Sequence, residues 1–176
     1  MLILFLLTAS VFLSAQEARL DTVLRGGRVY AAVEYLDSHS QEVLSSMWEG
    51  LRAEITFQLR LYRRASGIFA FLGDRLISER RVYQIASFDF YENHYKIQMG
   101  DRMAGEYSAE AEFLAAFFSL PETELGEVQV GDEGDYYLLA RVRMMPVKIV
   151  SPLNIITLFS TDTVFTTPWV EAELKP

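Results

Sequence analysis

The sequence predicts a mainly β fold, an antiparallel β-sandwich of about seven strands with two short helices, or a related α+β domain. Residues 51–63 alternate apolar and polar side chains almost without fault. A period of two residues places these two sets on opposite faces of one strand, one buried and one solvated. Turn signals separate the other apolar segments, and no long helical pattern alternates with strands. This disfavours a parallel α/β sheet.

Local patterns predict the elements before this strand. Residues 19–36 predict a hairpin, because Gly26 and Gly27 supply the positive φ angles of a tight turn. Ser38 is placed to cap a short helix, and Gly50 is placed to end it. The apolar stripe of this helix comprises Val43, Leu44, Met47, Trp48 and Leu51.

A second helix and the remaining strands follow. Ser108 precedes this helix and Pro121 follows it, with an apolar stripe of Phe113, Leu114, Phe117 and Phe118. Pro146 predicts an edge or a break, because proline cannot donate to a sheet ladder. Strands are predicted at 76–88, 125–130, 136–145 and 163–174, a hairpin at 88–99 that turns at Glu92 and Asn93, and a helical turn at 152–159.

Composition narrows the class of function. The net charge of −8 disfavours a nucleic-acid partner, which usually needs a basic surface. The absence of cysteine excludes disulfides, a thiolate nucleophile and cysteine-bearing zinc sites. Charge is also uneven: residues 52–81 carry seven arginines, whereas nine carboxylates and no lysine or arginine lie between Arg102 and Arg141. A solvated acidic face explains this most simply, and a protein with one face directed at an anionic surface is the alternative.

The first residues predict export. Residues 1–15 carry no charge, are largely apolar and end in the small residues Ser14 and Ala15. We interpret 1–15 as a signal peptide and 16–176 as a single β-rich domain of the periplasm or cell envelope. An uncleaved membrane anchor and a buried N-terminal strand are the alternatives.

The segment between the strands at 51–63 and 76–88 is the candidate binding site. Hairpin connections are normally polar, but this one carries five consecutive apolar residues between two glycines. Such a loop can bind a protein partner, dip into an anionic membrane surface between cationic shoulders, or pack back over the sandwich. The candidate binding residues are Arg63, Arg64, Ile68, Phe69, Phe71, Leu72, Arg75, Arg80 and Arg81.

Catalytic patterns are weak. His39 and His94 lie in no metal-binding spacing, and Glu54 and Glu79 are a pair of strand carboxylates such as any β protein offers by chance. The loop 131–135 is acidic but lacks the ligand spacing of a calcium loop. We therefore expect no catalytic residues, no metal and no cofactor. A carrier of apolar ligands and a hydrolase acting on envelope material are the alternatives to a binding domain.

Several strand segments resemble a known family. They are Glu49-Gly50-Leu51, Ile55-Thr56-Phe57, residues 60–64, residues 80–83, residues 136–143, Leu158-Phe159 and Trp169. Together they are similar to an exported bacterial family known as a domain of unknown function, the DUF4390-type periplasmic family. The chain departs from that pattern with Phe69 and Phe71 where tryptophans are more usual, and with a single late tryptophan. The resemblance implies an address in the cell envelope, and the neighbouring genes of some members imply a partner there. It implies no established activity.

Overall fold

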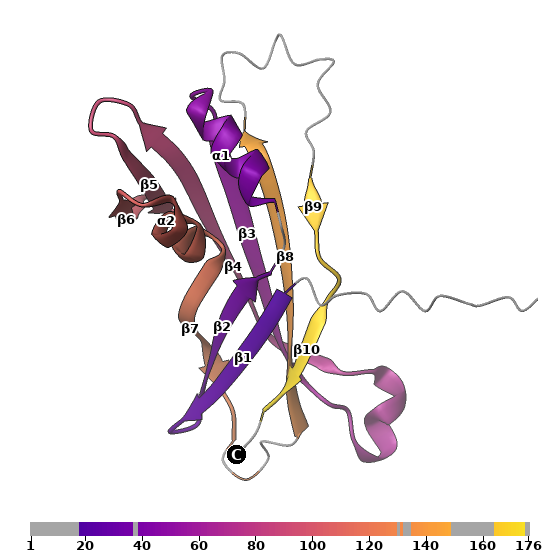
Figure 1. Ribbon diagram of the computed structural model, residues 1–176. Coiled ribbons are helices and arrows are strands. Elements are labelled where there is room, and N and C mark those ends of the chain that lie inside the picture. Colours follow the sequence, from indigo (N-terminus) through magenta and orange to yellow (C-terminus); the bar gives the residue numbers. More distant parts are fainter. Residues whose placement is uncertain (1–17, 37–38, 130, 132–134, 149–163, 175–176) are drawn as a thin grey trace, which may run out of the picture.

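Two antiparallel sheets form the architecture of the computed structural model, which describes residues 18–36, 39–129, 131, 135–148 and 164–174 (Figure 1). The described strands are β1 (Ala18–Arg25), β2 (Arg28–Tyr35), β3 (Arg52–Arg63), β4 (Arg75–Asp89), β5 (His94–Met99), β6 (Arg102–Tyr107), β7 (Ser119–Glu127), β8 (Tyr136–Lys148), β9 (Phe165–Thr166) and β10 (Val170–Glu173). The helices are α1 (Ser40–Trp48), α2 (Glu110–Phe117) and a 3-10 helix, η1 (Gly67–Leu72).

The strands divide unequally between the sheets. The small sheet has the order β1-β2-β7, and the large sheet has the order β10-β8-β3-β4-β5-β6 with β9 beside β8. The mainly β, antiparallel, sandwich-like prediction with two α-helices is confirmed. The prediction of about seven strands is too low, because ten strands lie in the described part of the chain. The predicted hairpin at 88–99 is followed by a further strand, because Gly100, with a φ angle of 61°, turns the chain from β5 directly into β6.

β3 is the central strand, as its alternation predicts. It pairs with β4 on one side and β8 on the other, and its apolar residues from Ala53 to Leu61 are fully buried. These side chains face the small sheet. Further core side chains come from every layer, the largest being Phe113 and Phe117 of α2, Met47 of α1, Leu120, Leu138 and Met144.

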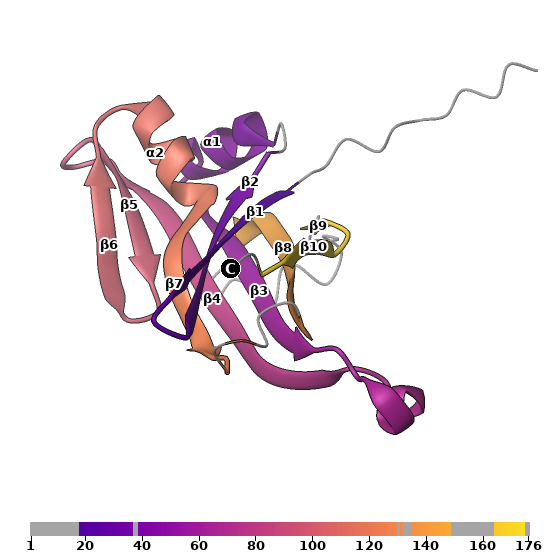
Figure 2. The same cartoon turned by 90° about the horizontal axis from the view of Figure 1, so that it is seen from below.

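Both helices lie on the inner side of the large sheet (Figures 1 and 2). α1 packs with Val43, Leu44 and Met47 as predicted, but Trp48 at its end is 52% exposed and packs on Phe88. The predicted cap Ser38 lies outside the described residues. The helix begins at Ser40, after His39.

Two prolines lie within strands. Pro121 follows α2 as predicted, and Pro146 lies where β8 pairs with β3 alone among the described strands, which agrees with the predicted edge. Pro121 is part of β7, an edge strand, where a missing N–H can face away from the ladder. Pro146 is part of β8, and the β3–β8 register shifts between Arg52 and Glu54, opposite this proline. The irregularity accommodates the missing donor, so β8 continues to Lys148. The predicted signal peptide 1–15 and the helical turn 152–159 lie outside the described residues.

Candidate functional site

The hairpin of β3 and β4 carries its connection away from the rest of the molecule. Both strands extend beyond the small sheet and end in η1, which projects from one end (Figures 1 and 2). Gly67 begins η1 and Gly73 follows it, with φ angles of 65° and 78° that other residues adopt only at a cost. We call residues 65–74 the tip.

The apolar residues of the tip face solvent. Ile68 and Phe71 are each 81% exposed, and Leu72 is 69% exposed. Leu76 and Ile77, the next two apolar residues of β4, are also exposed. The alternative in which the loop packs back over the sandwich therefore does not hold for these side chains. The backbone of Phe69 belongs to η1.

A carboxylate at the base of the tip ties its two ends together. Asp74 accepts a hydrogen bond from the backbone N–H of Ala65 at 2.9 Å and another from the hydroxyl of Tyr137 at 2.8 Å. Tyr137 in turn stacks on Tyr62 of the neighbouring strand. The tip is thus fastened to both β3 and β8, which fixes the direction in which it projects.

These hydrogen bonds change two pKa values. The N–H of Ala65 and then the hydroxyl of Tyr137 lower the pKa of Asp74, because both stabilise its ionised form. Partial burial and the neighbouring Asp74 carboxylate raise the pKa of Tyr137 to about 12. The two groups therefore stay as carboxylate and phenol over the physiological range.

The predicted cationic shoulders of the tip are largely neutralised. Arg64 lies 3.1 Å from Glu171 and 3.2 Å from Glu173, and its guanidinium stacks over Tyr137. Arg63 lies over the ring of Tyr136. Of the two arginines that precede the tip, Arg64 pairs with carboxylates of β10, and Arg63 lies 4.0 Å from Asp135.

The arginines of β4 point in different directions. Arg75 is exposed, and no ion pair to it is formed within the described part of the chain. Arg80 reaches across to the small sheet and donates to the backbone oxygen of Glu124 at 2.8 Å. Arg81 lies on the outer face of the large sheet, 2.8 Å from Glu79. The structure therefore brings Arg63, Arg64 and Arg75 to the tip, and it separates Arg80 and Arg81 from them.

Arg81 belongs to a second cluster, which the sequence analysis did not identify. It shares a polar groove of about 250 Å³ with three other arginines on the outer face of the large sheet. The sequence contains a signal for this cluster. Arg141 and Arg143 are two residues apart on one predicted strand and so share a face, and Arg60 lies on the polar face of β3. We call this the arginine groove, lined by Glu54, Thr56, Gln58, Arg60, Arg81, Tyr83, Arg141 and Arg143.

The two histidines considered for catalysis lie on different elements. His39 stacks on Phe165, whereas His94 begins β5 opposite Asp89. Hydrogen bonds from Gln58 and then Arg81 lower the pKa of Glu79, which keeps this carboxylate ionised. No group of three or more histidines and carboxylates in the described ranges could hold a metal ion. Residues 132–134 of the acidic loop lie outside the described ranges.

Comparisons with protein-family models, with curated proteins and with solved structures found no match for this chain. Among the helices that the structure describes, none is long and apolar enough to cross a membrane.

Proposed function

We propose that this chain is an exported binding domain of the bacterial cell envelope that docks a protein partner through the tip and the adjoining edge of β4. The observation that carries the proposal is the joint exposure of Ile68, Phe71 and Leu72 at the end of a fastened hairpin. Apolar side chains gathered on a surface mark sites of interaction. The leader 1–15 and the family resemblance support the export part of the proposal.

The edge of the large sheet beside the tip favours a polypeptide as the partner. The part of β4 that pairs with β5 is Gln84–Asp89, so residues 75–83 of β4 have β3 on one side and no strand of the described chain on the other. An unpaired edge presents free N–H and C=O groups to an added strand. Leu76 and Ile77 lie on this edge and continue the apolar surface of the tip.

Charge at the tip gives no comparable support to an anionic membrane. The cations closest to the tip are Arg63, Arg64 and Arg75, and the carboxylates beside them are Asp74, Asp135, Glu171 and Glu173. Attraction to anionic lipid requires a net positive surface. An apolar surface with balanced charges fits a protein interface better.

The two alternative functions receive less support from the described residues. A carrier needs a deep apolar cavity, whereas the hollow lined by Ile97, Met99 and Ala116 is about 240 Å³ and open to solvent. An enzyme needs convergent reactive groups, whereas His39 and His94 lie on different elements and Glu79 is held ionised by Gln58 and Arg81.

The test is capture of a partner from bacterial membrane and periplasmic fractions, followed by binding of the identified protein in purified form. The chain is compared with its Ile68→Ser/Phe71→Ser variant. We expect the variant to melt at nearly the same temperature, because both side chains are already exposed. We expect its affinity for the purified partner to fall at least about tenfold, since each apolar anchor contributes a kcal/mol or more.

A matched control removes two exposed apolar side chains elsewhere. Leu36 is 51% exposed and Met103 is 49% exposed, and neither lies on the tip or on β4. The Leu36→Ser/Met103→Ser variant should bind the partner like the parent chain. An equal loss in both double variants, or a large drop in melting temperature for the tip variant alone, would contradict the proposal.

A further inference from the structure

The arginine groove lies where three strands of the large sheet present polar side chains outward. Pairing places Arg81 of β4 and Arg141 of β8 on either side of Gln58 of β3. Two residues along, Tyr83 and Arg143 flank Thr56 in the same way. The small threonine between two long side chains forms the floor of the groove.

Hydrogen bonds hold this cluster in a defined arrangement. Gln58, which is 8% exposed, donates to Glu79 at 2.7 Å and accepts from Arg141 at 2.8 Å. Arg81 donates to the same Glu79 oxygen from Nε at 2.9 Å. Donors fixed in this way lose little freedom when a ligand binds, which favours affinity.

An aromatic ring supports the groove from β10's side of the sheet. The guanidinium of Arg60 lies 4.8 Å from the centre of the Trp169 ring, and that of Arg141 lies 4.5 Å from it. Stacking fixes the plane of a guanidinium while leaving its N–H groups available at the edge. The ring therefore helps to orient both guanidiniums, of which Arg60 also lies 3.5 Å from Glu79 and Arg141 donates to the neutral Gln58.

The groove has an excess of positive charge in a chain of net charge −8. Four arginines line it, and they are faced by the carboxylates of Glu54 and of the adjoining Glu79, which leaves a net of +2. Arg143 is exposed, and within the described ranges no carboxylate lies in ion-pair distance of it. Thr56 and Tyr83 add hydroxyl donors to the same lining.

We propose that the arginine groove binds a phosphate group, with Arg81, Arg141 and Arg143 as its charged donors. Guanidinium groups match the oxygens of phosphate in pairs, and a dianion matches the net charge of the groove. The phosphate is carried either by a small soluble phosphate ester or by a phospholipid headgroup. This site is separate from the tip and does not depend on the proposed docking of a protein there.

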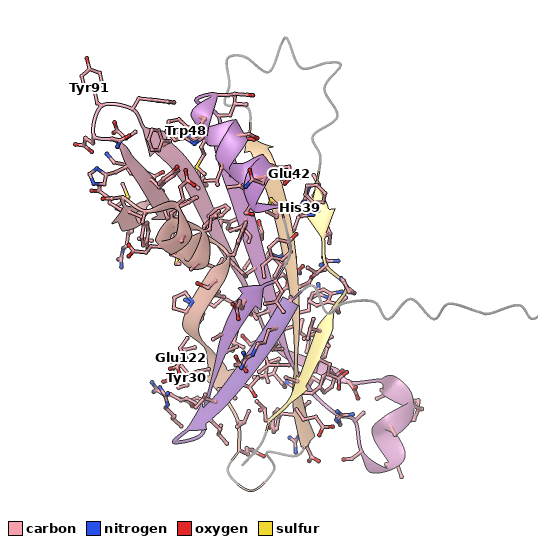
Figure 3. The ribbon with its side chains drawn as sticks, viewed as in Figure 1. Tyr30, His39, Glu42, Trp48, Tyr91 and Glu122 are labelled. Atoms are coloured by element: carbon pink, nitrogen blue, oxygen red, sulfur yellow. The ribbon has the colours of Figure 1, made fainter. Side chains whose placement is uncertain are left out.

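Tryptophan fluorescence gives a direct assay. The chain has two tryptophans, and Trp169 stacks on two groove arginines whereas Trp48 lies on α1 at the end of the molecule away from the tip (Figure 3). In a Trp48→Phe background the signal reports on the groove alone. Inorganic phosphate, glycerol phosphate and acetate are titrated at constant ionic strength, because general screening by salt must not change.

We expect a saturable change with both phosphates and none with acetate. Arg143→Gln should weaken phosphate binding about tenfold, the loss expected for one charged hydrogen-bond donor. Its fold should be intact, since Arg143 is exposed. Arg102→Gln, an exposed arginine on β6, is the matched control and should bind like the parent.

Three results would overturn the proposal: no saturable change with either phosphate, an equal response to acetate, or the same loss in Arg102→Gln as in Arg143→Gln. Sedimentation with vesicles separates the two sources of phosphate. Binding to vesicles that contain phosphatidic acid, whose headgroup is a phosphate monoester like glycerol phosphate, lost in Arg143→Gln, identifies a headgroup as the ligand. Saturable binding of glycerol phosphate without vesicle binding identifies a soluble ester.

Discussion

At the scale of the residue, single polar side chains decide how surface features are oriented. Asp74 fastens the tip by accepting from Ala65 and Tyr137, and Gln58 links Arg141 to Glu79 across three strands. Both act through geometry, because each hydrogen bond joins groups on different strands or on the two ends of a loop.

The two hydrogen bonds that Asp74 accepts, which we call the Asp74 clasp, lead to a prediction about the titration of Tyr137. The phenol should ionise near pH 12, and the Asp74→Asn variant should bring its pKa part of the way back toward 10. The return is partial because burial, the larger cause of the shift, is unchanged. Ultraviolet or NMR titration measures this. An unchanged tyrosine titration in Asp74→Asn, with Asp21→Asn on β1 as the surface control, would show that the clasp does not form.

At the scale of the element, two parts of β4 differ in how many neighbouring strands they pair with. Residues 84–86 pair with both β3 and β5, whereas residues 75–83 have a partner on one side only among the described strands. The far end of the β4–β5 turn carries Tyr91, which is fully exposed (Figure 3). These two parts of one strand therefore differ in their hydrogen bonding.

This difference predicts a pattern of amide hydrogen exchange. Alternate amides within residues 75–82 should exchange orders of magnitude faster than the amides of β3, which exchange only through large-scale opening. A bound partner that adds a strand to this edge should slow the exchange of these fast amides. Uniform protection along the whole of β4 in the free chain would refute the unpaired edge.

At the scale of the whole molecule, carboxylates that accept hydrogen bonds tie stability to pH. Asp89, which accepts first from Lys96 and then from the amides of Glu92 and Tyr91, has a lowered pKa, as do Asp74 and Glu79. The pKa of Lys96 is correspondingly raised by its hydrogen bonds to Asp89 and Glu92. Each carboxylate binds its proton less readily in the folded chain than in the unfolded one.

The sign of the resulting pH dependence follows from linkage. The three carboxylates contribute fully above their ordinary pKa values of 3.8 to 4.5, and their contribution is lost as the pH falls through the lowered folded values. We expect the free energy of unfolding, measured by urea denaturation, to fall steeply below about pH 4. Glu79→Gln should flatten this acid limb. A variant as steep as the parent would exclude Glu79 as a contributor.

The sequence determined the fold class and the central strand, because strict alternation from Leu51 to Leu61 allows one buried face only. It also located the tip, since an apolar run between Gly67 and Gly73 is local information. The tertiary structure decided the rest. Whether the tip faces solvent depends on how far β3 and β4 extend beyond the small sheet, and the arginine groove exists because pairing sets Arg81, Arg141 and Arg143 beside one another. The pattern of a single strand does not specify its register with a strand that is distant in the sequence.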